Sequence, residues 1–563
     1  MVLTKSLVSK LVQVAQNKLG RESLGYKIGT KTYLLICHLL RTLNVPARYF
    51  EDDLVLIKKI IHQSLEFKPN AEGKHIVFLS TRGWPVHLSF EALLAARLRM
   101  DGHRVTFLSC FDSIPLCMYG SSNHLPELQR NCEVCMANKV ALWEGVFEVE
   151  YFPCAKAIKD SIEVQVEQLD LSGCQAFEFD RAPYGDLVYR GIVWFLRRSR
   201  LSDADVHAYR MALIGAHTVR RGLEDFLSRN KVNTVVMING DFLSEKVASW
   251  VLQQNGIRFI THDYTFLERL AVAVSKSVWD DLSFMGKQQS PQINIHNAER
   301  RKAENLLRSW RRHGGYQGHL FWSKNNLKVN ENLHNMFDLD SRPIAVAYTN
   351  MTFESSVICK GRVFHDQFQW LEKLFVFFGL HQEFQLIIRI HPAEVRQSHW
   401  RPNESLYHFS NNNLRTIPGN VHIVEPDNKI SSYAIGEVAD AVLVYSSTLG
   451  MEMADRNKCV ITAAHVHYAN RGFTIDPNSE SDFFASILDV MQGRYHLSKM
   501  HRQCLVDYIA WLFFHRLTPF EAISGIREGW PQVNVSDISD LLSARYPGIQ
   551  RIAKLVSDGI KWW

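Results

Sequence analysis

The sequence is poor in cysteine and has no long apolar run. Its 563 residues include only 10 cysteines, too few for a scaffold held together by disulfide bonds. The best apolar run, residues 508–514, is far shorter than the roughly 18–20 residues that cross a bilayer. The N-terminus lacks the continuous apolar core and the small-residue cleavage site of a signal peptide. We therefore expect a reduced, soluble protein that works in the cytoplasm.

The common nucleotide-binding loops are also absent. The sequence contains neither G-x-x-x-x-G-K-[ST] nor G-x-G-x-x-G, the glycine-rich loops of P-loop ATPases and of dinucleotide-binding dehydrogenases. It shows no repeat with a period of roughly 20–50 residues and no low-complexity segment, which argues against a solenoid. These absences leave an enzyme-sized globular protein with an unconventional ligand site.

The charge balance is mildly basic. Hydrophobic residues make up 46% and charged residues 22% of the chain, as in an ordinary globular protein. Lys and Arg number 64 and Asp and Glu number 58, which leaves a net charge of +6. This charge suits an anionic substrate or peripheral contact with a membrane. Spread over so long a chain, it does not indicate a nucleic-acid partner, and we expect none.

Short apolar runs rich in β-forming residues alternate with helical stretches in two parts of the chain. Strands take this continuous apolar form in parallel sheets that helices cover on both faces. We therefore predict an α/β fold with two Rossmann-like, doubly wound domains that face each other across a cleft. The predicted strands are residues 75–80, 104–108, 234–238 and 257–261 in the first domain and residues 344–348, 384–390, 421–424, 441–445 and 459–462 in the second.

The predicted domains cover residues 71–335 and 336–500, with helical extensions at residues 1–70 and 501–563. Near the N-terminus, apolar side chains recur at four-residue spacing, which is typical of an amphipathic helix that lies on a membrane or packs on its own domain. These side chains are Leu3, Leu7, Leu11 and Ala15. A basic cluster between the domains is either a solvated helix face or a binding patch, and it consists of Arg300, Arg301, Lys302, Arg308, Arg311 and Arg312.

His391 stands directly after a predicted strand and directly before Pro392. Proline disfavours the helical conformation in the residue before it, so we expect His391 to be extended, with its ring facing the cleft. An imidazole there can donate to a phosphate or supply a proton to a leaving group. Arg389, two residues earlier on the same strand face, can add a positive charge. The alternative is a structural histidine beside a strand-ending proline.

Three consecutive hydroxyl side chains, Ser446, Ser447 and Thr448, follow a predicted strand and precede a predicted helix. Free backbone N–H groups and the helix dipole favour a phosphate at such a position. Glu452, about one turn into the helix, can accept hydrogen bonds from ribose hydroxyls. The alternative is ordinary N-capping. Because His391 follows another strand of the same sheet, the two motifs together favour a nucleotide mono- or diphosphate site without a P-loop.

Three strings in the second predicted domain carry a family resemblance. They are RIHP at residues 389–392, DAVLVYSSTLGME at 440–452 and YANRGFT at 468–474. They resemble bacterial capsule polysaccharide biosynthesis proteins, which include Kdo-transferase-like glycosyltransferases of the GT-B fold. Bacterial sialyltransferases carry a similar His-Pro and Ser-Ser/Thr pair. The resemblance extends in layout over residues 75–480.

The resemblance implies that His391, Ser446, Ser447 and Thr448 hold the nucleotide of a CMP-sugar donor. The second domain then binds the donor, and the first domain binds the acceptor and supplies the catalytic base. Arg471 can pair with a carboxylate of the donor if the sugar is an acidic ulosonic acid, because a guanidinium matches carboxylate geometry. A structural salt bridge is the alternative for Arg471.

Asp241 is the first candidate for the base. It follows a predicted strand of the first domain in an Asn-Gly-Asp turn, where the glycine permits a tight turn. A carboxylate beside a sugar hydroxyl can act as a general base, although an ordinary turn explains the same residues. Asp263 ranks second, and Gly83 and His87 in the first β–α loop are further candidates to line the cleft.

The cysteines of the first domain are candidates for a metal site. Cys132 and Cys135 form a C-x-x-C, and Cys110, Cys117 and Cys154 lie nearby in the sequence. Four thiolates can bind zinc. Two or three free, buried thiols are the plainer alternative, and we expect no metal at the catalytic site.

The leading interpretation is a metal-independent glycosyltransferase. It would move a sugar, such as the ulosonic acid Kdo, from a nucleotide-sugar donor to a surface polysaccharide or glycolipid at the inner face of the membrane. Alternatives are a nucleotide-sugar epimerase, a CDP-polyol phosphotransferase, and a non-catalytic scaffold that uses the N-terminal helix and the tail Trp562–Trp563. The predicted catalytic residues are Asp241 and His391, and the predicted donor-binding residues are Arg389, His391, Ser446, Ser447, Thr448, Glu452 and Arg471.

Overall fold

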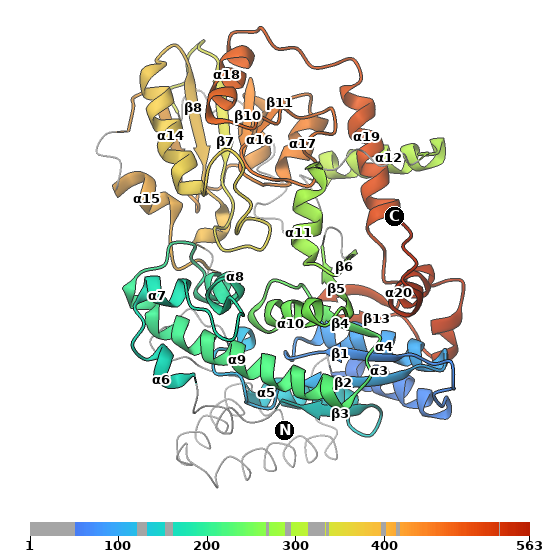
Figure 1. Cartoon of the computed structure of the whole chain (residues 1–563). Coiled ribbons are helices and arrows are strands. Elements are labelled where there is room, and N and C mark those ends of the chain that lie inside the picture. Colours follow the sequence, from blue (N-terminus) through green and yellow to red (C-terminus); the bar gives the residue numbers. More distant parts are fainter. Residues whose placement is uncertain are drawn as a thin grey trace, which may run out of the picture.

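The structure, a computed structural model, contains two sheets of mainly parallel strands, one in each half of the chain (Figure 1). It describes residues 51–120, 132–152, 162–265, 269–287, 294–313, 333, 337–395, 401–412, 417–527 and 530–563. The two sheets with their helices confirm the predicted α/β class. The predicted N-terminal amphipathic helix lies outside the described residues. None of the described helices combines the length and the apolarity that a bilayer crossing requires.

The first sheet has six strands in the order β3-β2-β1-β4-β5-β6. All neighbouring pairs are parallel except β5 and β6, which are antiparallel. The strands are β1 (His75–Leu79), β2 (Arg104–Ser109), β3 (Glu148–Tyr151), β4 (Thr234–Ile238), β5 (Arg258–Tyr264) and β6 (Leu270–Val274).

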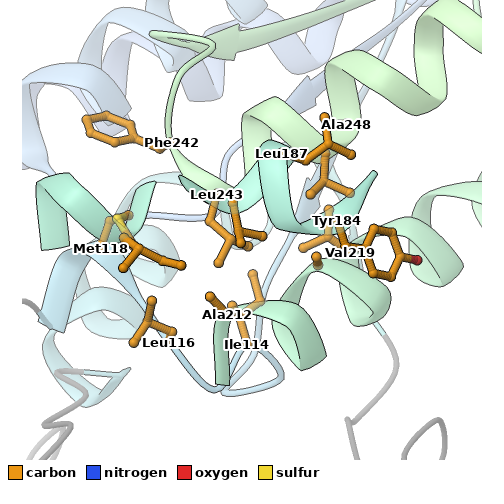
Figure 2. Close-up of a cluster of buried hydrophobic side chains, with 14 of the residues drawn as sticks. Ile114, Leu116, Met118, Tyr184, Leu187, Ala212, Val219, Phe242, Leu243 and Ala248 are labelled. Atoms are coloured by element: carbon orange, nitrogen blue, oxygen red, sulfur yellow. The ribbon is translucent and has the colours of Figure 1, made fainter. Parts of the chain in front are cut away.

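Helices cover both faces of the first sheet because alternate side chains of its strands point to opposite faces. On β1, Val77 and Leu79 join the core with α8, α9 and α10, whereas Ile76 and Phe78 join the core with α3 and α4. Figure 2 shows the first of these cores, with Leu243 of α10 among side chains from three other segments. The helices of this half are α3 (Glu51–Gln63), α4 (Pro85–Met100), α5 (Cys132–Trp143), α6 (Glu163–Val166), α7 (Leu171–Gln175), α8 (Tyr184–Leu196), α9 (Val206–Arg229), α10 (Leu243–Gln254) and α11 (Val278–Ser283).

The second sheet has five parallel strands in the order β11-β10-β7-β8-β9. They are β7 (Ile344–Tyr348), β8 (Gln385–Arg389), β9 (Val421–Val424), β10 (Ala441–Val444) and β11 (Cys459–Thr462). One face packs against α11, α12 and α16, and the other packs against α14 and α18. The helices are α12 (Asn297–His313), α14 (Gln367–Leu380), α15 (Leu406–Asn412), α16 (Ser432–Glu437), α17 (Leu449–Asp455) and α18 (Glu480–Met491).

The C-terminal segment runs from the second half of the chain back to the first (Figure 1). Its helix α19 (His501–Trp511) joins the core of the second sheet, and α20 (Pro547–Asp558) joins the core that contains α3 and α4. Between them lies a two-stranded sheet of β12 (Ile523–Arg527) and β13 (Trp530–Val533). The segment predicted to be helical therefore also contains two strands. Trp562 and Trp563 pack against the first half of the chain.

Two features of the first sheet differ from the prediction. The predicted strand at residues 257–261 continues to Tyr264 as β5, because the antiparallel edge strand β6 pairs with Ile260 through Tyr264. Asp263 is therefore a strand residue and does not follow the strand. The edge strands β3 and β6 were not predicted, and β6 makes the sheet mixed where a fully parallel one was expected.

Candidate functional site

The strand order of the second sheet places a topological switch point between β7 and β10. From β7 the chain proceeds outward through β8 and β9, and it then returns to the other side of β7 with β10 and β11. In open α/β sheets, ligands bind at the carboxyl ends of the strands on either side of such a point. The residues that follow β7 and β10 begin with Thr349 and Tyr445 respectively.

A hydrogen bond joins the two sides of this switch point. The backbone N–H of Ser446 donates to Asn350 Oδ1 at 3.2 Å. The Gln367 side chain holds the backbone of Asn350 twice, because its Oε1 accepts from the Asn350 N–H at 2.7 Å and its Nε2 donates to the Asn350 carbonyl at 3.3 Å. Gln367 is buried at the start of α14. Asn350 is thus fixed in position, with its Nδ2 as the remaining donor of the side-chain amide.

His391 is connected to the same point through Thr349. The His391 backbone N–H donates to Thr349 Oγ1 at 2.9 Å. His391 Nδ1 accepts from the Ala393 N–H at 3.2 Å, so in the neutral ring the proton resides on Nε2, which acts as a donor. His391 caps the short 3-10 helix Pro392–Glu394 in an extended conformation, as predicted from the following proline. The dipeptide Thr349–Asn350 therefore brings together the two predicted motifs.

Two buried hydroxyl groups lie in the segments that follow β7 and β10. Ser446 Oγ and Thr352 Oγ1 have no hydrogen-bond partner within the described part of the chain, and both residues are buried. A buried polar group without a partner costs about 1–3 kcal/mol. A polar ligand that reached these hydroxyls would remove that cost.

The helix behind these hydroxyls is short. Ser447 Oγ accepts from the Leu449 N–H at 3.3 Å, and Thr448, at the N-cap of α17, makes no side-chain capping bond. Helix α17 has only seven residues. A helix of two turns adds little to an anion site through its dipole, because few aligned peptide units contribute. A phosphate at this position would therefore depend mainly on individual hydrogen-bond donors.

Arg389 and Glu452 are occupied by protein groups. Arg389 is buried at the end of β8 and donates to the carbonyls of Glu425 and Asn428, the latter at 3.0 Å. Desolvation lowers the pKa of Arg389 to about 10, so the guanidinium remains charged at neutral pH. Its hydrogen bonds stabilise the loop after β9. Glu452 Oε2 accepts from the hydroxyl of Tyr433 on α16 at 2.5 Å. The structure therefore does not bring either side chain together with Asn350.

Arg471 lies in the loop after β11 and contacts the other half of the chain. Its Nη2 donates to the carbonyl of Met285 at 2.7 Å, and its guanidinium lies 5.7 Å from the ring centre of Trp511. Burial lowers the pKa of Arg471. Among the alternatives for Arg471, this geometry favours a structural role.

Asp241 belongs to a buried ion cluster between the two halves. It is 3% exposed, and its Oδ1 accepts from Arg190 Nη1 at 2.6 Å. Arg190 also contacts Asp280 of α11 at 2.9 Å, and Asp280 pairs with Lys360, which follows β7. Desolvation opposes the negative charge of Asp280, but Lys360 and Arg190 outweigh it and lower the pKa to about 2. Arg190 thus engages the carboxylate of Asp241, and the catalytic role of Asp241 stays a prediction.

The remaining candidates of the first half lie around its own switch point, between β1 and β4. Burial raises the pKa of Asp263 to about 6, although Asp263 accepts hydrogen bonds from Trp279 and Asn239. Burial lowers the pKa of His87 well below its usual value. Gly83 is fixed by packing, because a Cβ there would lie 2.5 Å from the Cα of Cys135.

The cysteines that the structure describes are free thiols. Burial raises the pKa of Cys117 to about 11 and raises the pKa values of Cys132 and Cys135, so these groups stay protonated at neutral pH. Within the described ranges, no group of three His, Cys, Asp or Glu residues is placed to hold a metal ion. Cys154 lies outside the described residues.

Part of the predicted basic cluster forms ion pairs on α12. Arg300 pairs with Asp507 at 2.6 Å, and Arg311 pairs with Asp455 at 2.9 Å. Arg308 pairs more loosely with Glu304 at 3.4 Å. Arg301 and Lys302 are exposed, and the side chain of Arg312 lies outside the described ones. This arrangement fits a helix face that is partly solvated and partly tied to neighbouring helices.

Sequence reasoning missed Thr349, Asn350 and Gln367. The sequence did contain a signal for Thr349 and Asn350, because these polar residues come directly after the apolar run 344–348. The rule that ligand-binding residues follow the strands of a parallel sheet points to them as much as to His391. No local signal marked Gln367, which acts from a helix that begins well after the strand.

Comparison with known proteins gives remote structural likenesses only. No protein-family model and no curated protein sequence matches the chain. The chain is similar to the Thermosulfurimonas dismutans KpsC β-Kdo 2,4 transferase, with 14% identity and a TM-score of 0.37 over 55% of this chain and 88% of that chain. It is similar to a sucrose-phosphate synthase from Thermosynechococcus elongatus, with 10% identity and a TM-score of 0.28 over 78% of this chain and 96% of that chain.

A third solved structure is a Methanocaldococcus jannaschii UDP-GlcNAc 2-epimerase in complex with UDP-GlcNAc and UDP. The identity is 11% and the TM-score 0.26, over 78% of this chain and 99% of that chain. At such identities and TM-scores, these likenesses are too remote to assign an activity. The architecture rests on the strand order of the two sheets.

Proposed function

We propose that the protein is a glycosyltransferase that binds the nucleotide of its sugar donor at the switch point of the second sheet. The observation that carries this proposal is the convergence of His391 and Ser446 on the dipeptide Thr349–Asn350, which follows the central strand β7. A sheet edge that gathers an imidazole, an amide and an unpartnered hydroxyl at its switch point supports a polar, phosphate-bearing ligand.

The chemistry at this point would be electrostatic stabilisation of a leaving phosphate. His391 Nε2–H would donate to a phosphate oxygen or protonate it as the bond to the sugar breaks. Asn350 Nδ2 and the Ser446 hydroxyl would donate to the same group. These donors are held by Thr349 and Gln367 before the ligand arrives, which reduces the cost of organising them.

The proposal also covers the identity of the sugar donor and of the acceptor. The motif resemblance favours a CMP-linked donor, and an acidic ulosonic acid such as Kdo fits it best. The acceptor would be a surface polysaccharide or glycolipid, reached by peripheral contact with the inner face of the membrane, and the transfer would need no metal. The predicted donor-domain and acceptor-domain boundaries belong to this proposal as well.

The test measures binding of CMP, UDP and GDP to the purified protein by calorimetry. We expect saturable binding of CMP, and a His391→Ala variant should bind at least about tenfold more weakly, which corresponds to about 1.4 kcal/mol. His365→Ala is the matched control, because the His365 side chain is 87% exposed in the same half of the chain. If the protein bound none of the three nucleotides, the proposal would be wrong.

Incubation with the donor alone separates the competing enzymes. A glycosyltransferase needs the acceptor for its product. An epimerised nucleotide-sugar in the absence of acceptor would identify an epimerase, and a phosphorus-containing glycan product would identify a polyol-phosphate transferase. Nucleotide binding without any turnover would favour a scaffold.

A further inference from the structure

Glu354 lies in the segment that connects β7 to the ion cluster between the two halves. It follows Asn350 by four residues in a tight turn, where the Val357 N–H donates to the Glu354 carbonyl at 2.8 Å. The neighbours Phe353 and Val357 are both buried. The turn and its buried neighbours therefore fix the backbone of Glu354 four residues beyond Asn350.

Both halves of the chain hold this segment. Met351, Phe353 and Ile358 belong to the core that α8, α9 and α10 form on the first sheet. At the end of the segment, Lys360 pairs with Asp280 of α11. Glu354 thus lies where the donor half meets the predicted acceptor half.

The Glu354 side chain combines solvent exposure with a raised pKa. The residue is exposed to solvent, and yet desolvation by the surrounding protein raises its pKa to about 7. An exposed side chain on a convex surface is well solvated and keeps its ordinary pKa. We read the combination as a carboxylate on a concave surface, open to a ligand but crowded by protein.

Its environment contrasts with that of Asp241. Asp241 is 3% exposed and bonded to Arg190, so an acceptor cannot easily reach it. The pKa of Glu354 is raised by desolvation. A carboxylate with a pKa near the working pH is the better general base.

We propose that Glu354 is a catalytic residue that deprotonates the acceptor hydroxyl, an inference that rests on the proposed glycosyl transfer. The Glu354 carboxylate takes the proton as the acceptor oxygen forms its bond to the anomeric carbon. The bond between the anomeric carbon and the donor phosphate oxygen breaks, and its electron pair leaves with the nucleotide. The products are the glycoside, the free nucleotide phosphate and a protonated Glu354.

The experiment compares Glu354→Gln with the wild-type protein in nucleotide binding and in sugar transfer. Glutamine keeps the size of the side chain but cannot accept the proton. We expect CMP affinity within about twofold of wild type and a kcat lower by about 100-fold or more, the usual contribution of general base catalysis. Glu372→Gln is the matched control, because Glu372 is exposed on α14 in the same half.

The pH dependence provides a readout that a structural role would not give. In the wild type, kcat/KM should fall as the pH drops below about 7, because the base becomes protonated. This acidic limb should vanish in Glu354→Gln and persist in Glu354→Asp at a lower rate. The other titratable groups on the segment are Cys359 and Lys360, and Asp280 and Arg190 face Lys360 from the first half.

The outcomes distinguish the inference from the proposed function. Transfer by Glu354→Gln within about threefold of wild type, or an unchanged acidic limb, would overturn the role of Glu354 and leave the donor site standing. A wild-type protein that binds no nucleotide would overturn both. If Glu354→Gln did not fold, Glu354→Asp would decide, since a missing acidic limb in that variant contradicts the inference.

Discussion

Ser446 and Asn350 are joined across the centre of the second sheet by a hydrogen bond of 3.2 Å, from the backbone of one strand end to the side chain of the other. These residues follow β10 and β7, the strands between which the chain reverses its direction of growth. The bond holds together the two sides of the point at which α/β sheets bind ligands. A change of Asn350 should therefore affect ligand binding more than it affects the fold elsewhere.

Replacing Asn350 by aspartate should weaken nucleotide binding. The Ser446 N–H can still donate to a carboxylate oxygen, but the new negative charge repels a phosphate, and juxtaposed like charges cost several kcal/mol. We expect CMP affinity to fall by at least about 30-fold, or about 2 kcal/mol, in a calorimetric titration. Asn478→Asp, at an exposed position two residues before α18, is the control. Equal affinities in both variants would place the phosphate elsewhere.

Gly450→Ala should destabilise the protein, although alanine normally favours a helix by about 1 kcal/mol over glycine. A Cβ at position 450 would lie 2.3 Å from the hydroxyl of Tyr468. Tyr468 is fully buried and donates to the Ser447 carbonyl, so it cannot swing away freely. Overpacking of this kind costs about 1–3 kcal/mol.

The measurement for Gly450→Ala is urea unfolding, with Gly419→Ala as its control, because no atom lies within 4 Å of a Cβ at position 419. We expect a lower unfolding midpoint for Gly450→Ala alone. A midpoint that did not change would show that Tyr468 has room to move.

Lys360→Met should destabilise the association of the two halves. Lys360 is 0% exposed and pairs with Asp280 from the other half. Breaking a buried ion pair from one side costs about 3–5 kcal/mol, and we expect the lower end, because Arg190 still contacts Asp280 at 2.9 Å. The free energy of unfolding in urea measures the loss.

A matched surface pair provides the control for Lys360. Lys373 pairs with Glu480 at 2.8 Å, and both side chains are 42% exposed. Exposed pairs contribute about 0–1 kcal/mol, so Lys373→Met should leave stability nearly unchanged. Similar losses in both variants would mean that burial of Lys360 adds nothing.

Glu91 should make the protein less stable as the pH rises. Desolvation raises its pKa from 4.5 to about 8, while its carboxyl group contacts Ser80 and His262. Between these values the folded state keeps a proton that the unfolded chain has lost, so stability decreases with rising pH. Desolvation lowers the pKa of His262 from 6.5 to about 3. This shift makes stability increase with rising pH, but only below pH 6.5.

Above pH 6.5 the opposing effect of His262 has ended, and Glu91→Gln isolates the contribution of Glu91. Glutamine resembles the protonated acid, so its variant should lose the decrease between pH 6.5 and 8, which amounts to at most about 2 kcal/mol at 1.4 kcal/mol per pH unit. Thermal unfolding at several pH values measures this, with the exposed Glu167→Gln as control. A parallel decline in the wild type and Glu91→Gln would exclude Glu91 as the cause.

The sequence predicts most of this fold because buried parallel strands are locally recognisable. Of the five strands of the second sheet, β7, β9 and β11 have the predicted bounds, since each is a short run rich in β-forming residues. Strand β3 was not predicted because it is an edge strand, with Glu148 and Tyr151 exposed. In β6, alternating alanines weaken the β signal, since alanine favours helices.

The sequence predicts only part of the site, because the hydrogen bonds that link its residues depend on the spatial order of the strands. His391 and Ser446 each carry a local signal, a proline neighbour and a run of hydroxyls. Their link through Thr349 and Asn350 exists only because β7 lies between β8 and β10. Likewise, no residue near Asp241 in the sequence indicates its ion pair with Arg190, which lies on α8.

A co-crystal structure with CMP tests the central claim most directly. The account predicts that the nucleotide phosphate lies at the carboxyl ends of β7 and β10, within hydrogen-bond distance of Asn350, His391 and the Ser446 hydroxyl. A nucleotide bound instead at the switch point of the first sheet, beside the residues that follow β1 and β4, would contradict it.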